Sequence, residues 1–207
     1  MTSIYHVTHI RNLPNILKDG GLWCDHIVSE RGLAYVGIAH QHIKERRAMK
    51  PVPVSAGGVL ADYVPFYFAP RSPMLYSIHR GNVQGYSDGQ RPILHLVSSA
   101  ESVQNRKIPF SFTDGHAPMD ISQYYERLSD LNQIDWKIMK ETYWADTVED
   151  GDRTRRRQAE FLVHQFFPFD LVESIGVINR DMATQAAGLL QELKQKPNVQ
   201  VIPAWYY

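Results

Sequence analysis

IYHVTHIRNLPNILKDGG, residues 4–21, decides how the fold begins. Residues 4–7 carry β-branched and aromatic side chains, which are typical of a strand. Asn12 is a candidate N-cap for a helix with Pro14 in its first turn, and Gly20–Gly21 would end that helix. We therefore expect a strand, a short helix and a turn at the start of the chain.

A second strand is predicted over residues 63–69, where side chains alternate between two faces. Phe66 and Phe68 share one face, and Tyr67 lies on the other. Pro65 has no backbone N–H to donate, so it favours an edge strand or a position among the first residues of the strand.

The remaining pattern indicates more strands than helices. Further strands are predicted at residues 92–97, 108–113, 174–179 and 198–202. Helices are predicted at residues 37–50 and after the candidate N-cap Asp181, whereas residues 160–167 fit either type. Because there is no regular βαβ alternation, we expect an α+β fold with mixed or antiparallel sheets and peripheral helices. Residues 1–207 are expected to form one domain, with residues 114–157 as an inserted loop or helical segment.

The composition excludes several classes of protein. Lys plus Arg and Asp plus Glu each total 22, so the formal net charge of the 207 residues is zero. Neutrality argues against tight, sequence-blind binding of a polyanion, although basic residues gather at 44–50 and 153–157. Cys24 is the single cysteine, which excludes a disulfide framework and a multi-cysteine zinc site. We expect it to be a buried structural thiol.

Targeting and cofactor motifs are absent from the sequence. No stretch is apolar and long enough for a signal peptide or a membrane span, so we expect a soluble, cytoplasmic protein. There is no GxGxxG, GxxxxGK[ST], HExxH or GxSxG motif. The nine histidines do not cluster with acidic residues at ligand spacing, and no metal site is expected.

Three local features are candidates for chemistry. His6 and Thr8 lie two positions apart on the first strand, so they share a face and can hold a polar ligand such as a ribose. They could equally be hydrogen-bonded within a sheet. PFYFAPRSPML, residues 65–75, joins an aromatic strand to a turn that contains Arg71. This stretch suits ring stacking beside a guanidinium, or a core strand with a rigid turn.

The third feature is RRRQAEF, residues 155–161, in which a basic run is followed by one carboxylate and an apolar segment. On an extended chain Gln158 and Glu160 point the same way. A solvated charged stretch is the ordinary alternative. The abrupt change to apolar residues favours a carboxylate at the rim of a sheet.

In this chain order the three features resemble the DarT family of DNA ADP-ribosyltransferases, the toxins of DarT–DarG pairs. The resemblance extends from Tyr5 to Trp205 and rests on YHVTHIRNLPNIL, ERRAMKPVPV, DYVPFYFAPRSPMLY and RRRQAEFLVHQFFPFDLV. It implies the ADP-ribosyltransferase fold, with two packed small sheets around an NAD⁺ cleft. It also implies sequence-specific transfer of ADP-ribose from NAD⁺ to a base in single-stranded DNA, with thymidine expected ahead of guanosine.

The resemblance further implies roles for individual residues. Glu160 matches the catalytic glutamate, and Arg47 is assigned ahead of Arg46 as the catalytic-site arginine. His6 and Thr8 match residues that hold the nicotinamide side of NAD⁺. The other cofactor contacts implied are Arg46, Tyr67, Phe68 and Arg71.

Residues 114–157 resemble the substrate-contacting loop that precedes the glutamate in this family. Aromatic side chains suit the stacking of unpaired bases, and arginines suit phosphate groups. The DNA contacts that we expect are Tyr124, Trp136, Tyr143, Trp144, Arg153, Arg155 and Arg156.

Two alternatives stay open at this point. The first is another NAD⁺-dependent transferase that acts on RNA or protein, since Gln158 before Glu160 is also a pattern of protein-modifying transferases. The second is a catalytically silent nucleic-acid or protein interaction module on the same fold. The family further implies a macrodomain antitoxin that removes ADP-ribose, and we expect the chain itself to be a monomer.

Overall fold

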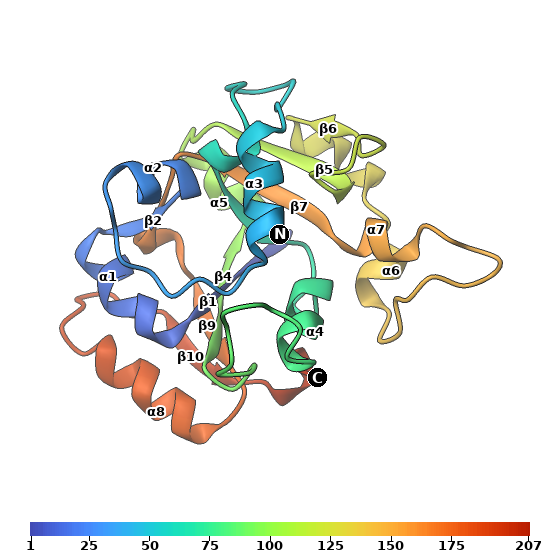
Figure 1. Cartoon of the computed structure of the whole chain (residues 1–207). Helices are drawn as coiled ribbons and strands as arrows, with labels where there is room; N and C mark the ends of the chain where they lie inside the picture. The colour runs from blue at the N-terminus through green and yellow to red at the C-terminus, as the bar shows by residue number, and fades with distance from the viewer.

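The computed structural model describes residues 1–207, and its centre is one sheet of eight strands (Figure 1). In spatial order the strands are β10 (Asn198–Val201), β9 (Ser174–Val177), β4 (Ile93–Ser99), β1 (Ser3–His9), β3 (Tyr63–Tyr67), β7 (Ala159–His164), β5 (Phe110–His116) and β6 (Tyr124–Tyr125). Only β9 and β10 are parallel neighbours, and the other pairs are antiparallel. A separate small sheet pairs β2 (Gly21–Trp23) with β8 (Phe166–Pro168).

The two packed sheets that the resemblance implied are two halves of this single sheet. β1 is the last strand of one half, and it pairs with β4 along its whole length. β3 is the first strand of the other half, and it pairs with β1 only through Tyr67 and Tyr5. Pro65 has no N–H for this ladder, and its carbonyl accepts a bond from the side chain of His6 instead. The α+β class is confirmed, but the two packed small sheets that we expected are joined into one eight-stranded sheet by a single backbone pairing.

The position of β3 excludes one of the two expectations for Pro65, the edge strand, whereas Pro65 does lie among the first three residues of β3. β3 lies inside the sheet, between β1 and β7. An interior strand tolerates Pro65 because the missing donor faces the seam between β1 and β3, where the two backbones are hardly paired. This seam is the part of the fold on which the site is built.

Eight short helices surround the sheet, and α3 passes in front of it in Figure 1. They are α1 (Leu13–Lys18), α2 (Asp25–Glu30), α3 (Gln41–Met49), α4 (Pro73–His79), α5 (Ala100–Asn105), α6 (Trp136–Lys140), α7 (Arg153–Arg157) and α8 (Arg180–Leu189). The N-cap of α8 is Asn179, whose side chain accepts a bond from the N–H of Met182. Asp181 therefore lies in the first turn of α8 and is not its cap.

Residues 160–167, which fitted either type by pattern, form nearly all of β7 and the start of β8. Gln165 separates the two strands with a φ of 57°. β7 is buried on both faces along nearly its whole length, so its sequence shows no apolar–polar alternation. The other predicted strands are present as β4, β5, β9 and β10, and their ends differ from the prediction by at most three residues.

The main hydrophobic core contains 30 buried residues and spans both halves of the sheet. Phe66 from β3 and Phe161 from β7 are fully buried in it. Cys24 is also buried there, as expected. None of the helices combines the length and the hydropathy that a membrane crossing requires.

Candidate active site

The centre of the site is a buried ion pair between β7 and α3. Nη1 of Arg47 donates to Oε2 of Glu160 at 2.7 Å, and the two residues are 7% and 2% exposed. The other carboxylate oxygen accepts a bond from the backbone N–H of Ala117 at 3.2 Å. Burial alone would lower the pKa of Arg47, but the adjacent carboxylate more than offsets this effect and the pKa is raised. Nη2 of Arg47 is buried and has no partner in the protein.

The strand register brings an aromatic ring to this pair. Tyr67 of β3 lies directly opposite Glu160 of β7 in the antiparallel ladder. Burial raises the pKa of Tyr67, and the Glu160 carboxylate raises it further. The phenol therefore stays neutral and can only donate or accept hydrogen bonds.

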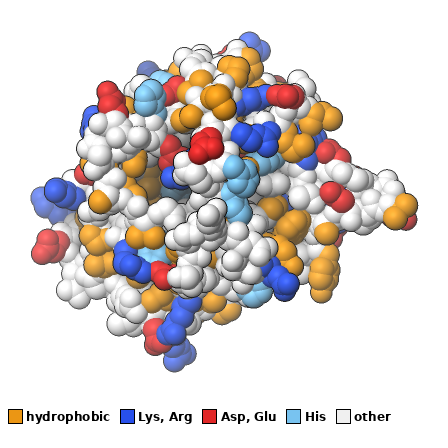
Figure 2. All heavy atoms as spheres, in the orientation of Figure 1, with side chains coloured by type: hydrophobic (Ala, Val, Ile, Leu, Met, Phe, Trp, Pro, Cys, Tyr) orange, Lys and Arg blue, Asp and Glu red, His pale blue; other side chains and the backbone are white.

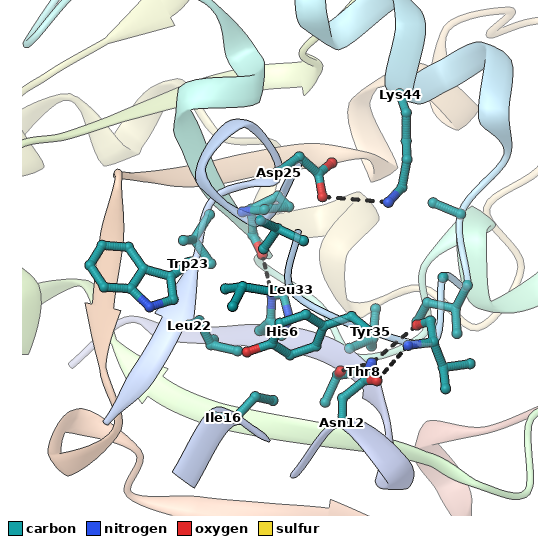
Figure 3. Close-up of a pocket in the computed structure, with 18 of the residues that line it drawn as sticks. His6, Thr8, Asn12, Ile16, Leu22, Trp23, Asp25, Leu33, Tyr35 and Lys44 are labelled. Atoms are coloured by element: carbon teal, nitrogen blue, oxygen red, sulfur yellow. Dashed lines mark hydrogen bonds and ion pairs between the residues drawn. The ribbon is translucent and has the colours of Figure 1, made fainter. Parts of the chain in front are cut away.

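A pocket of about 210 Å³ lies over the seam between β1 and β3, walled by the coil that leads into α3. Tyr67 lines it, so the pocket and the ion pair are direct neighbours. Figure 2 shows the surface hollowed left of centre on this face, with charged side chains above the hollow. Figure 3 shows His6 and Thr8 on the floor and Lys44 at the upper rim.

His6 and Thr8 project from the same face of β1 into this pocket. Nδ1–H of His6 donates to the carbonyl of Pro65 at 2.8 Å, and this bond leaves Nε2 as an acceptor. Burial lowers the pKa of His6, so its ring is neutral. Oγ1 of Thr8 accepts a bond from the side chain of Asn12 at 3.1 Å. The predicted pair therefore offers a ligand one acceptor and one hydroxyl.

Comparison with known proteins decides the family. The family described as "ssDNA thymidine ADP-ribosyltransferase, DarT" matches residues 5–207. The chain belongs to the DarT family. A DNA ADP-ribosyl transferase of Thermus aquaticus is 45% identical over 100% of this chain and 89% of its own length. The chain is accordingly an NAD⁺-dependent DNA ADP-ribosyltransferase.

Solved DarT structures superimpose on the whole chain. DarT of Thermus sp. 2.9 in complex with ADP-ribosylated single-stranded DNA has a TM-score of 0.93 at 42% identity, over 100% of this chain and 96% of that chain. The same protein in complex with NAD⁺ has a TM-score of 0.89 at 40% identity, over 100% and 98%. A Thermosipho africanus DNA ADP-ribosyl transferase–glycohydrolase fusion is 30% identical over 97% of this chain and 47% of its own length.

Three further polar residues of this DarT-family pocket had not been assigned to it from the sequence. Nζ of Lys44 lies 3.5 Å from Oδ1 of Asp25 at the rim. Lys44 precedes Arg47 by three positions, so the two side chains lie on the same face of α3. This spacing could have predicted that Lys44 lies near the site. Asn12, which we expected to cap α1, makes no capping bond and points into the pocket. Asn12 belongs to the motif YHVTHIRNLPNIL but was interpreted there only as a helix cap, and Asp25 lies outside the motifs that carry the resemblance.

His116, at the end of β5, was also missed. Burial lowers its pKa, the Glu160 carboxylate opposes that effect, and Arg47 adds to it. His116 lies opposite Ala159 in the β5–β7 ladder, directly before Glu160, so it is a neighbour of the ion pair. Two strands that are far apart in sequence bring the two side chains together, so no local spacing could have predicted it.

Three expected cofactor contacts lie elsewhere. Arg46 points away from its neighbour Arg47, and its Nη2 donates to the carbonyl of Pro118 at 3.1 Å. Phe68 directly follows β3 and is buried in the main core, where its ring meets that of Phe161 edge-on at 6.2 Å. The guanidinium of Arg71 stacks on the terminal Tyr207 at 4.3 Å. None of the three lines the pocket, so these cofactor contacts are not supported.

The aromatic residues of segment 114–157 divide into packed and exposed groups. The Tyr124 hydroxyl donates to the carbonyl of Ala117, so this ring sits beside the ion pair. Trp144 donates through Nε1 to the hydroxyl of Tyr207 at 2.8 Å. Tyr143 is 85% exposed on the loop between α6 and α7, which projects from the body on the right of Figure 1.

The arginines of the same segment are mostly engaged by carboxylates. Arg155 makes two 2.7 Å bonds to Asp152 and packs so closely on Gly115 that a Cβ there would lie 2.2 Å from its Nη1. Arg156 donates to Asp135 at 2.8 Å and also pairs with Asp150. Arg153 donates to the carbonyls of Tyr143 and Ala145. These side chains fold the segment, and their positive charge is largely offset within it.

We predict that Trp136→Ala destabilises the protein rather than weakening DNA contact. The ring meets Phe68 edge-on at 5.6 Å, and its Nε1–H donates to the carbonyl of Leu131 at 2.8 Å. Urea unfolding should show a loss of about 2–4 kcal/mol, whereas the matched Tyr143→Ala should change the unfolding free energy by less than about 0.5 kcal/mol. An unchanged unfolding curve for Trp136→Ala, together with lost DNA modification, would contradict the packing role.

Proposed function

We propose that this protein binds NAD⁺ in the pocket over the β1–β3 seam and transfers ADP-ribose to thymidine in single-stranded DNA, within a short preferred sequence. The observation that carries the residue assignment is the buried Arg47–Glu160 pair beside that pocket. Burying two charges costs free energy that packing alone does not return. A buried pair with an unused donor, Nη2 of Arg47, is typical of a site where charge develops during a reaction.

The residues of the pocket fit the nicotinamide riboside part of NAD⁺. A ribose hydroxyl both donates and accepts, and it is matched by Nε2 of His6 as acceptor and the hydroxyl of Thr8 as donor. Tyr67 provides an aromatic wall next to Glu160. Lys44 at the rim can bind a phosphate group of NAD⁺, and its ion pair with Asp25 would then be replaced by this new one. Each of these four residues has a separate task in holding the cofactor.

NAD⁺ supplies an ADP-ribosyl group whose bond to nicotinamide breaks as positive charge builds on the ribose. Glu160 is fixed by Arg47 and by the N–H of Ala117, so its carboxylate is oriented before any ligand arrives. We assign it two tasks: to stabilise that positive charge, and to accept the proton of the attacking base nitrogen. The new bond joins this nitrogen to the ribose carbon, and nicotinamide leaves as a neutral molecule with the electron pair of the broken bond.

The target base reaches Glu160 past the turn of residues 116–122. Three contacts fix this turn: Ala117 N–H to Glu160, Arg46 to the Pro118 carbonyl, and Lys50 to Asp120 at 2.6 Å. Tyr124 packs beneath it. A base must leave its stack to reach a buried carboxylate, so single strands are the suitable substrate. We propose that Tyr124, Tyr143, Trp144 and Arg153 supply DNA contacts, whereas Trp136, Arg155 and Arg156 hold the segment in shape.

Purified protein tests the proposal when it is mixed with NAD⁺ and, in parallel, with single-stranded DNA, RNA or protein. We expect nicotinamide release and a mass gain of one ADP-ribose on thymidine-containing DNA only. Homopolymers of the other three deoxynucleotides are the matched controls. A mass gain on RNA or on protein instead of DNA would overturn the choice of substrate, and no gain on any substrate would indicate a silent binding module.

We also propose that a separate glycohydrolase reverses the modification. A covalent modification of DNA bases harms the cell in which the enzyme is made. Such a cell therefore needs a second enzyme that removes the modification. The Thermosipho relative, in which both activities are named in one fusion protein, supports this pairing. Modified DNA from the assay above should lose its added mass when such a macrodomain hydrolase is supplied.

A further inference from the structure

The coil that walls the pocket is held by side chains rather than by its own backbone. Residues 34–39 make no backbone–backbone hydrogen bond, although most of them line the pocket. Their central residue is Val36, whose N–H donates to Oδ1 of Asn12 at 2.7 Å and whose carbonyl accepts from Nδ2 of the same side chain at 3.1 Å. Asn15 adds one exposed bond to the carbonyl of Ala34, and the hydroxyl of Tyr35 donates to Asp19 at 3.0 Å. Asn12 is the side chain that bonds both backbone groups of a residue in this wall.

Asn12 also sets the direction of the Thr8 hydroxyl. The amide Nδ2–H donates to Oγ1 of Thr8 at 3.1 Å, and both side chains are buried (Figure 3). A hydroxyl that accepts from an amide keeps its own proton for another acceptor. No protein atom accepts a bond from Thr8, so the proton remains available to a ligand in the pocket.

We propose that Asn12 is a positioning residue for NAD⁺ binding, which fixes the Thr8 hydroxyl as a donor and holds the pocket wall at Val36. The inference rests on the proposed function, because it assumes that NAD⁺ occupies this pocket. Asn12 has no contact with Glu160 or Arg47, so its loss should weaken binding and spare the chemical step. All three hydrogen bonds of Asn12 are formed without a ligand. The Thr8 hydroxyl and the wall at Val36 therefore do not have to lose conformational entropy when NAD⁺ binds.

The decisive variant is Asn12→Asp. Aspartate keeps the acceptor for the N–H of Val36, but it offers no donor, and the Thr8 hydroxyl would turn its proton toward the new carboxylate. We expect the Kd for a non-hydrolysable carbocyclic NAD⁺ analogue, measured by calorimetry, to rise about 10- to 100-fold. The KM for NAD⁺ should rise in parallel, while kcat for DNA modification at saturating NAD⁺ changes less than about threefold.

Two comparisons separate positioning from nonspecific effects. In a Thr8→Val background, Asn12→Asp should raise Kd clearly less than it does in the wild type, because the hydroxyl that Asn12 orients is already gone and only the bond to the Val36 carbonyl is lost. Asn15→Asp introduces the same charge nearby and removes one bond to the coil, and it should change Kd less than about threefold. Simple repulsion between the introduced carboxylate and a phosphate would instead weaken binding equally in both backgrounds.

The outcomes distinguish this inference from the proposed function. If the wild-type protein modifies no DNA and does not bind the analogue, the proposed function fails. If it is active and the two substitutions are additive, or Asn12→Asp leaves Kd unchanged, only the role of Asn12 is overturned. Should Asn12→Asp fail to fold by circular dichroism, Thr8 provides the test: Thr8→Ser should bind the analogue like the wild type and Thr8→Val about tenfold more weakly, and equal binding would refute the need for a donor.

Discussion

Glu160→Gln is expected to reduce transfer of ADP-ribose to single-stranded DNA by about 10³-fold or more. The amide has the same shape and can still accept the bond from the N–H of Ala117. It carries no negative charge to stabilise the ribose, and it cannot accept a proton from the base. Both tasks assigned to Glu160 are therefore lost together, and kcat should fall much more than the affinity for NAD⁺. Single-turnover mass spectrometry of the DNA product measures the loss.

Folding must be controlled separately, because Glu160→Gln leaves Arg47 as a buried charge without a counter-charge. Breaking a buried pair in this way costs about 3–5 kcal/mol. Combining Glu160→Gln with Arg47→Met removes both charges, and this double variant should regain much of the stability while remaining inactive. Glu173→Gln is the matched control outside the site, where the carboxylate only accepts bonds from Ser99 and Ser102. A well-folded Glu160→Gln with more than about a tenth of wild-type activity would contradict the catalytic assignment.

The parts of the site that lie on regular strands could be predicted from the sequence. His6 and Thr8 share a face because a strand repeats every two residues, and both line the pocket. The same rule placed Phe68 on the face of Phe66, opposite to Tyr67, yet the resemblance assigned it to the cofactor. The periodicity was the better guide, since the ring of Phe68 is enclosed by other aromatic rings.

The parts that depend on contacts between distant segments could not be predicted. Gln158 and Glu160 were expected to point the same way on an extended chain, but Gln158 ends α7, and its amide donates to the carbonyl of Thr154. His116 and Ala117 approach Glu160 only because β5 pairs with β7. Asn12 offered a helix-cap pattern, but its side chain bonds the two unpaired backbone groups of Val36 instead.

The difference between Arg46 and Arg47 follows the same logic. Adjacent residues on a helix point about 100° apart, so only one of them can face β7. The resemblance placed Arg47 ahead of Arg46, although the motif ERRAMK itself contains both arginines side by side. The fold turns Arg47 inward onto Glu160 and Arg46 outward onto the turn of residues 116–122. Their neighbouring positions make them a natural matched pair for mutation.

Arg47→Ala is expected to lower kcat/KM for DNA modification by at least about 100-fold, whereas Arg46→Ala should lower it by less than about fivefold. Alanine at position 47 removes the charged bond that orients Glu160 and the free Nη2 donor, and it leaves a buried carboxylate without a partner. Alanine at position 46 removes one bond to a backbone carbonyl from an exposed residue.

Arg47→Lys shows whether charge or shape matters at this position. Lysine keeps the positive charge but lacks the planar fork that serves two acceptors at once. If the spare Nη2 contacts a ligand, Arg47→Lys should recover the stability that Arg47→Ala loses while restoring less than about a tenth of the activity. Full recovery of activity by lysine would show that the charge opposite Glu160 is sufficient. Equal losses for Arg46→Ala and Arg47→Ala would show instead that the turn of residues 116–122, rather than the buried pair, controls the reaction.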